Sequence, residues 1–167
     1  AEKNKDADAK NTTEDMNQLL QEFATEYNVS TFDKIKTEHY MTAFEAGMKE
    51  HNENIDKIIN SEEKANFKNT IEAYIFSKEK LSKALSVFYN QKGANTNDEI
   101  NKIAEEASPK LSAHSDKITL NNDLFKKIEA VYKNMENDDL TEEQKFITEN
   151  LYNSFARNGA LLNKKEK

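Results

Sequence analysis

The chain has 167 residues, carries a net charge of −7 and contains no cysteine. This charge argues against nonspecific binding to nucleic acid or to anionic membranes, because both need a surplus of Lys and Arg on one face, and Arg157 is the only arginine. A hydrophobic fraction of 36%, a charged fraction of 33% and only three Gly and one Pro favour long solvent-facing helices around one core.

Residues 1–15 have the composition of a flexible leader. They contain no large apolar side chain and cannot bury enough surface to offset the entropy lost on ordering. A tether left after removal of a signal peptide has this composition, which favours an exported, periplasmic location; the frayed terminus of a cytoplasmic protein is the alternative. No run of about 18 apolar residues occurs, so no membrane span is predicted.

The first predicted helix covers residues 37–59. Large side chains recur at intervals of three and four, which places them on one helical face that must pack against other elements. That face consists of Met41, Phe44, Met48, His51, Ile55 and Ile58. Thr37 is the predicted N-cap of this helix, through its hydroxyl.

A second helix is predicted from residue 67 to about residue 88. Its apolar stripe consists of Phe67, Ile71, Tyr74, Leu81, Leu85 and Phe88. Lys78 takes one position of the stripe, where its aliphatic stem can lie on the apolar face while the ammonium points to solvent. Gly93 is the predicted end of this helix.

The third helix is predicted to open with a capping box, in which the hydroxyl of Thr96 and the carboxylate of Glu99 satisfy free amides. Its stripe consists of Ile100, Ile103, Ala107, Leu111, His114 and Ile118. Pro109 falls inside this stretch and removes the hydrogen bond to the carbonyl of Glu105, at a cost of about 3 kcal/mol if uncompensated. We therefore expect a kink or a break into two helices.

Two shorter helices complete the pattern. The first carries Leu124, Phe125, Ile128, Val131, Tyr132 and Met135. An acidic turn at residues 136–139 leads to a capping box of Thr141 and Gln144. The helix that follows carries Phe146, Ile147, Leu151 and Phe155. Gly159 is the predicted left-handed cap, and residues 163–167 are predicted to be the start of a further helix, too short to be stable alone.

These elements predict an all-α fold, an antiparallel helical bundle or array of about five to six helices. The predicted organisation is a leader at residues 1–15, a helical domain at residues 16–162 and the truncated helix at residues 163–167.

The three histidines do not match a zinc peptidase motif, which needs two His one helical turn apart with a Glu between them, H-E-x-x-H. Four residues after His39, His51 and His114 stand Ala43, Ile55 and Ile118, and four residues before them stand Ile35, Gly47 and Lys110. No two histidines can therefore share one helical face at ligand spacing. We predict no catalytic, cofactor-binding or metal-binding residue, no bound zinc and no hydrolase activity for the chain alone.

Other candidate side chains have a structural interpretation. His39, beside a helix start, is interpreted as a capping or packing residue, and His51 and His114 as boundary side chains with satisfied hydrogen bonds. Glu105 and Glu106 are interpreted as a solvated face, because no calcium-loop pattern surrounds them. An aromatic set could line a peptide cleft but has the spacing of a helical core: Phe76, Phe88, Tyr89, Tyr132 and Tyr152.

Six strings of the sequence are FDKIKTEHYMTAFEAGM, FKNTIEA, SVFYN, GANTNDEI, PKLSAHSD and FARNGA. In this order they resemble the amino-terminal helical region of the thimet-oligopeptidase-like zinc metallopeptidases, and most of all the bacterial peptidyl-dipeptidases. The residues that look like the family's opening helix are Phe32, Asp33, Ile35, His39, Tyr40, Phe44, Gly47 and Met48. Those that look like the start of its second helix are Asn69, Thr70 and Ile71, and those that look like the cap of its third helix are Asn95, Thr96, Asn97, Asp98 and Glu99. Thr37 departs from the pattern, which has Pro at this position.

The resemblance implies a function. In such enzymes the helical amino-terminal part forms one wall of a deep channel for short peptides, while the carboxyl-terminal portion holds the zinc ligands, the general-base Glu and most substrate contacts. This sequence reaches Lys167 without a zinc motif, so none of those roles transfers to a residue here. We interpret the chain as the noncatalytic amino-terminal domain of a zinc peptidyl-dipeptidase, whose partners are the catalytic remainder and, in the parent, short peptides.

The alternative is a self-standing acidic helical binding or structural module with no enzymatic parent, which composition and periodicity fit equally well. If a catalytic portion is missing, part of the apolar surface lacks its cover, and exposed patches of this kind tend to self-associate. We then expect a homodimer or marginal stability, with an exposed surface around Phe146, Leu151, Phe155 and Leu161.

Overall fold

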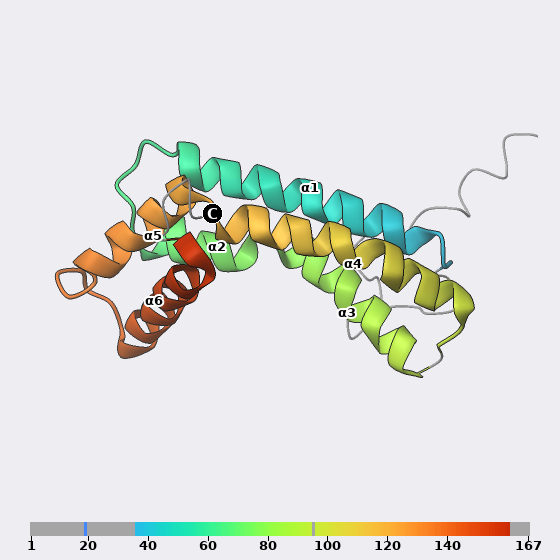
Figure 1. Cartoon of the computed structure of the whole chain (residues 1–167). Coiled ribbons are helices and arrows are strands. Elements are labelled where there is room, and N and C mark those ends of the chain that lie inside the picture. The colour runs from blue at the N-terminus through green and yellow to red at the C-terminus, as the bar shows by residue number, and fades with distance from the viewer. Residues whose placement is uncertain (1–18, 20–35, 95, 161–167) are drawn as a thin grey trace, which may run out of the picture.

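Figure 1 shows the computed structural model, which describes Leu19, residues 36–94 and residues 96–160. The predicted all-α fold is confirmed, since these described ranges hold helices and turns and no strand. In chain order the elements are α1 (His39–Asn60), η3 (Phe67–Glu72), α2 (Ala73–Phe76), α3 (Glu79–Ala94), α4 (Asp98–Thr119), α5 (Asn122–Asn134), α6 (Glu142–Phe155) and η4 (Ala156–Ala160). Both η segments are π-helical. The predicted leader and the predicted helix at residues 163–167 lie outside the described residues.

Helix α1 forms where the apolar stripe predicts it, but its start differs from the prediction. Glu38 takes the N-cap position without a side-chain cap, and the hydroxyl of Thr37 instead donates to Oε2 of Glu99 at 3.2 Å. The backbone amide of Lys36, which precedes the helix, donates to Nδ1 of His39 at 3.3 Å, and His39 is buried, as the packing interpretation predicts. Thr37 therefore joins α1 to α4 rather than capping α1.

The second predicted helix is wrong as a single element, because the chain divides into η3, α2 and α3. Asn66 and Asn69 form a reciprocal capping box at its start. At the break, the hydroxyl of Ser77 donates to the carbonyl of Tyr74 at 2.6 Å, and the side-chain amide of Asn54 donates to the carbonyl of Ser77 at 3.1 Å. Side-chain bonds of this kind compete with the helical ladder. Gly93 lies just before the end of α3.

Helix α4 corrects two predictions. Its N-cap is Asn97, whose Oδ1 accepts from the amide of Ile100 at 2.9 Å, so the capping box predicted at Thr96 is misplaced by one residue. The helix also continues through Pro109 without the expected break (Figure 1). Pro109 and Glu105 are both exposed, so water can reach the carbonyl that loses its partner.

The last two helices follow the prediction closely. The N-cap of α5 is Asn121, whose Oδ1 accepts from two backbone amides. The helix buries four residues of its predicted stripe, Leu124, Phe125, Ile128 and Val131, while Tyr132 and the C-cap Met135 are half-buried. α6 opens with the predicted capping box, in which Thr141 Oγ1 accepts from the amide of Gln144 at 3.2 Å and Gln144 Oε1 accepts from the amide of Thr141 at 3.0 Å. Gly159 has the predicted left-handed conformation, with φ of 91°.

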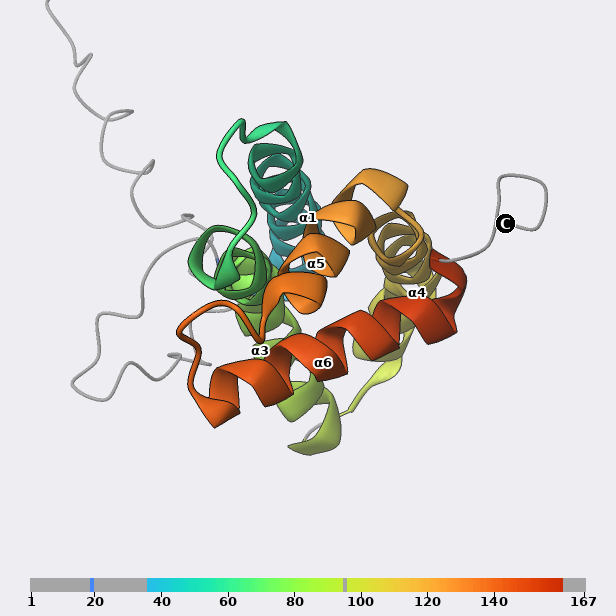
Figure 2. The same cartoon turned by 90° about the vertical axis from the view of Figure 1, so that its left-hand side faces the viewer.

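The buried side chains form two clusters instead of the single expected core. Figure 1 shows α3 running back along α1 and α4 running again in the direction of α1; these three helices enclose the first cluster. At the other end, α5, α2 and η3 pack near the end of α1, and α6 lies across α5 (Figure 2). The first cluster consists of Leu19, Tyr40, Ala43, Phe44, Leu81, Ala84, Val87, Phe88, Ile100 and Ala107. The second consists of Ile55, Ile58, Ile71, Ile118, Leu124, Phe125, Ile128, Val131 and Phe155.

The two clusters follow from the length of α1. A helix of 22 residues is about 33 Å long, so its apolar face passes both groups of helices. Between Phe44 in the first cluster and Ile55 in the second, the buried positions of α1 are taken by Gly47 and by a polar residue, His51. His51 therefore marks the junction between the two clusters.

Candidate functional site

The junction between the two clusters holds a pair of histidines from different helices. Nδ1 of His51, on α1, lies 2.9 Å from Nε2 of His114, on α4, and the ring centroids are 5.0 Å apart. This is hydrogen-bonding distance, so one ring nitrogen donates and the other accepts. His51 is buried and His114 is half-buried.

The helical stripes explain how each ring reaches this position. His51 lies four residues before Ile55, and His114 lies four residues before Ile118, so each histidine is on the buried face of its helix. The packing of α4 against α1 then brings the two together. The sequence indicated both as boundary residues, but it did not predict that they pair, because 63 residues separate them.

The prediction that these two histidines have all their hydrogen bonds satisfied is wrong in one respect. Nε2 of His51 is buried and has no hydrogen-bond partner among the described residues. Because Nδ1 is held by His114, Nε2 is left either as an unpaired donor or as an unpaired acceptor, depending on the tautomer. Such an atom costs free energy, about 1–3 kcal/mol in proteins, and calls for a functional or structural explanation.

The surroundings of the pair disfavour a positive charge. Burial, followed by His114 and Lys78, lowers the pKa of His51 to about 4. Burial, followed by Lys117, also lowers the pKa of His114. Both rings are therefore neutral at pH 7, and the charged groups that shift them are all cationic.

A cavity of about 250 Å³ opens beside the pair, and we call it the seam pocket. Its polar lining consists of His51, Tyr74, Lys78, Ser82, His114, Ser115 and Thr119. Its apolar lining consists of Leu81, Leu85, Leu111 and Ile118. These residues come from α1, α2, α3, α4 and the break between α2 and α3, so the unpredicted break at Ser77 helps to form the pocket.

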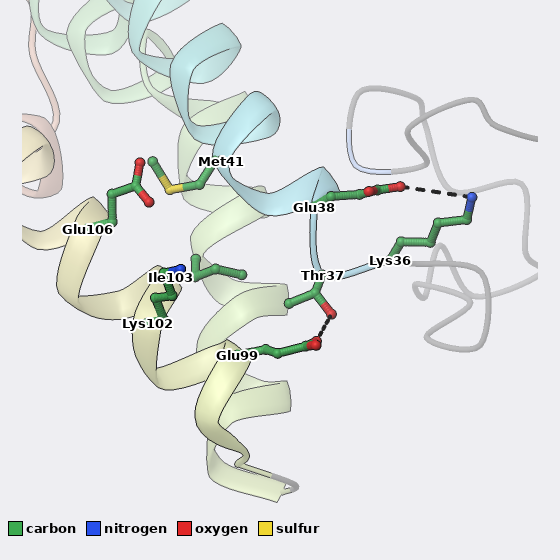
Figure 3. Close-up of a pocket in the computed structure, with 8 residues that line it drawn as sticks. All are labelled: Lys36, Thr37, Glu38, Met41, Glu99, Lys102, Ile103 and Glu106. Carbon is green, nitrogen blue, oxygen red and sulfur yellow. Dashed lines mark hydrogen bonds and ion pairs between the residues drawn. The ribbon is translucent and has the colours of Figure 1, made fainter.

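A second, larger cavity of about 490 Å³ lies between the start of α1 and the first half of α4 (Figure 3). Met41 and Ile103 supply its apolar side, and the hydrogen bond between Thr37 and Glu99 crosses one end. The remaining lining residues carry charges of both signs: Lys36, Glu38, Lys102 and Glu106. Mixed, exposed charges of this kind do not converge on one ligand chemistry.

The aromatic candidates do not form one cleft. Phe88 is buried in the first cluster, and the rings of Tyr132 and Tyr152 stack beside the second cluster with centroids 4.0 Å apart. Phe76 and Tyr89 are exposed on different helices. The core interpretation holds for Phe88 and for Tyr152, which packs against the second cluster. Tyr132 is half-buried and stacks on Tyr152, and the core interpretation is wrong for Phe76 and Tyr89.

The acidic pair behaves as the sequence indicates. Glu105 and Glu106 are both exposed, and Glu106 forms a 3.8 Å ion pair with Lys110 on the helix surface. Lys110 also pairs with Glu45 of α1 at 3.0 Å, and this hydrogen bond raises the pKa of Lys110. These contacts join α4 to α1 at the surface.

The predicted apolar surface patch is only partly present. Phe146 is 65% exposed, but Phe155 is only 1% exposed because it belongs to the second cluster. Leu151 is half-buried, and Leu161 lies outside the described residues. Ile75 and Phe76 of α2 and Tyr89 of α3 are also exposed.

Comparison with known proteins shows which enzymes the chain is similar to. No protein-family model matches the chain. It is 33% identical over 151 residues to the dipeptidyl carboxypeptidase of Salmonella typhimurium strain LT2, and 33% identical over 152 residues to that of Escherichia coli strain K12. The chain is similar to bacterial dipeptidyl carboxypeptidases. The predicted resemblance is thus confirmed over 90% and 91% of the chain, which spans 22% of the length of each relative.

The described residues do not fit the zinc ion that the resemblance to dipeptidyl carboxypeptidases implies. Within residues 36–94 and 96–160, together with Leu19, no three or more His, Cys, Asp or Glu side chains are grouped so that they could hold a metal. The histidine pair supplies two nitrogens, no carboxylate lines its pocket, and Lys78 lies close enough to oppose a cation. In this same part of the chain, no helix combines the length and apolar composition that crossing a membrane requires.

Proposed function

We propose that the chain is a noncatalytic helical region of a zinc metallopeptidase of the dipeptidyl carboxypeptidase type, and that it forms one wall of a channel for short peptides. The observation that carries the proposal is the 33% identity over nine tenths of the chain. In this function the parent enzyme hydrolyses peptides to release carboxyl-terminal dipeptides, and residues beyond this chain hold the zinc.

The helical architecture supports a scaffolding role. α1 is a continuous helix of 22 residues with helices packed along its whole length, which gives a stiff element suited to a wall. The exposed side chains Phe76, Tyr89 and Phe146 offer apolar contacts to the catalytic remainder or to peptide. The acidic charge supports an absence of nucleic acid among the partners. An exported, periplasmic location is part of the proposal, and cell fractionation with an antibody against the chain tests it.

The coding frame tests the relationship to an enzyme. A frame that continues past Lys167 for several hundred codons and contains H-E-x-x-H supports the proposal. The longer protein should then release dipeptides from an amino-blocked peptide, and a chelator should stop the reaction. The 167-residue chain, assayed in parallel, should bind no stoichiometric zinc and should release no dipeptides. A stop codon directly after Lys167 would instead favour the self-standing helical module.

Photo-crosslinking tests the channel wall. In the longer protein, a photoreactive phenylalanine replaces Phe76, Tyr89 or Phe146 in turn, and a labelled peptide that resists cleavage is added. A wall position should crosslink to the peptide, and an excess of unlabelled peptide should abolish the product. The matched control places the same photoreactive residue at Tyr132, which is half-buried and stacks on Tyr152. Equal labelling at all four positions, or none at any, would refute the wall.

A further inference from the structure

The seam pocket combines a cationic polar side with an apolar side, in a cavity that is lined mainly by three helices. Helix α1 contributes His51, α3 contributes Leu81 and Leu85, and α4 contributes Leu111 and His114. Both α3 and α4 pack on α1, so the pocket is a groove between α3 and α4 with α1 beneath it. Its volume of about 250 Å³ suits a small ligand, or the terminal part of a larger one, of fewer than about ten non-hydrogen atoms.

The charge of the pocket is opposite to that of the chain. No carboxylate lines it, although the sequence has 31 Asp and Glu against 24 Lys and Arg. The carboxylate next to His51 in the chain, Glu50, forms an ion pair with Lys80. Lys78 lies at the pocket and forms no ion pair with any residue that the structure describes. Its charge, together with that of Lys117 on α4, opposes protonation of the two histidines.

The polar groups of the pocket are hydrogen-bond donors suited to an anion. The ammonium of Lys78 has three donors, and the hydroxyls of Ser82 and Ser115 each supply one more. His114 uses Nε2 in the pair with His51, which leaves its Nδ1 to donate when the ring is protonated. Opposite these groups, the side chains of Leu85 and Leu111 give the apolar surface.

We propose that the seam pocket binds a small aliphatic carboxylate. The carboxylate group lies against Lys78, Ser82 and Ser115, near the His51–His114 pair, and the alkyl group lies on Leu85 and Leu111. A bound anion favours the protonated form of His114. Nδ1 of that ring then donates to the ligand, while Nε2 keeps its bond to His51. This ligand site goes beyond the channel-wall function and does not depend on it.

The test is a titration of the isotope-labelled 167-residue chain with 4-methylpentanoate, followed by amide and imidazole NMR resonances. We expect saturable shifts confined to residues 78–85, residues 111–119 and His51, with a Kd of about 1 mM, as a ligand of this size allows. Binding should tighten about fivefold between pH 7.5 and pH 5.5, because a nearby anion raises the pKa of an imidazole while the carboxylate remains ionised.

Ligand controls separate charge from apolar contact. 4-Methylpentan-1-ol has the same alkyl group without the charge, and 4-methylpentylamine has the opposite charge, so both should bind at least about tenfold more weakly. Acetyl-Ala-Leu and its carboxyl-terminal amide distinguish two sources of the bound carboxylate, the carboxyl terminus of a peptide and a free acid. Binding of the peptide acid but not the amide assigns the pocket to peptide carboxyl termini, and binding of 4-methylpentanoate without the peptide assigns it to free acids.

Variant controls locate the site. Lys78→Gln should weaken the binding of 4-methylpentanoate about fivefold, and the side chain is exposed, so the fold is retained. Lys126→Gln is the matched control on α5, far in sequence from the pocket, and it should leave the Kd unchanged. Among the residues that the structure describes, Lys126 pairs only with Asp123, on the surface. Equal affinity for the alcohol and the acid, an equal loss in both variants, or an absence of saturable shifts at 50-fold the expected Kd would overturn the proposal.

Discussion

Helices α1 and α3 approach each other so closely at Gly47 that a single methyl group should destabilise the fold. A Cβ atom built at Gly47 would lie 2.8 Å from Cα, 3.0 Å from Cβ and 3.1 Å from the backbone nitrogen of Leu81. The contact is with backbone atoms, which cannot rotate away, so Gly47→Ala forces the helices apart. Overpacking of this kind costs about 3 kcal/mol at the upper end of its range, and the helix preference of Ala over Gly returns about 1 kcal/mol. We therefore expect a net loss of about 2 kcal/mol.

Gly93→Ala is the matched control, because it makes the same change inside a helix where no atom lies within 4 Å of the new methyl group. It should stabilise the chain by about 0.5 kcal/mol through helix preference alone, less than at Gly47 because Gly93 is the penultimate residue of α3. The measurement is urea unfolding of both variants by circular dichroism, with equal m-values confirming that the unfolded states are comparable. Since Leu81 also lines the seam pocket, Gly47→Ala should weaken 4-methylpentanoate binding as well. If Gly47→Ala were as stable as Gly93→Ala, the close packing of α1 on α3 would be wrong.

Three further predictions concern pH, capping and surface exposure. The pKa of His51 is about 4 in the folded chain and near 6.5 in the unfolded chain, so its contribution to stability is complete above about pH 6.5 and is lost as the pH falls toward 4. The free energy of unfolding measured in urea should decrease by about 2 kcal/mol between pH 7.5 and pH 5, and His51→Gln should make this decrease smaller. In the same assay, Thr141→Ala should lower the free energy of unfolding by about 1 kcal/mol, because Thr141 caps α6. Thr96→Ala should lower it by almost nothing, because Asn97 and not Thr96 caps α4. Equal losses in the two variants would contradict these caps. Phe146→Ser should reduce the binding of a hydrophobic dye and any self-association without lowering stability, because the ring is exposed. Phe155→Ala, at a buried ring, should lower the free energy of unfolding by about 3–5 kcal/mol. A large stability loss for Phe146→Ser would show that this ring is covered.

The elements that the sequence predicted well are those fixed by short-range chemistry. The capping box of Thr141 and Gln144 and the left-handed Gly159 depend on residues within one helical turn, and both are confirmed. The stripes of α1 and α5 are equally local, because intervals of three and four place side chains on one face of any helix.

The predictions that failed depend on contacts from elsewhere in the chain. Asn54 of α1 donates to the carbonyl of Ser77, and this contact helps to end α2 within a stripe that reads as continuous. Thr37 was expected to cap α1, but its hydroxyl is taken by Glu99 of α4. In each case the deciding partner lies on another helix, where the local sequence pattern does not show it.

By itself, the sequence determined that the chain is helical, where most helices lie and which enzymes it resembles, because periodicity, capping residues and family-like strings are all properties of neighbouring positions. The tertiary structure alone decided that the buried side chains divide into two clusters and that a histidine pair and a cationic pocket lie between them. His51 and His114 look alike in the sequence, as polar residues on apolar stripes. Only the packing of α4 on α1 sets their ring nitrogens 2.9 Å apart, since the register between two helices is fixed by the summed contacts of both and not by either stripe.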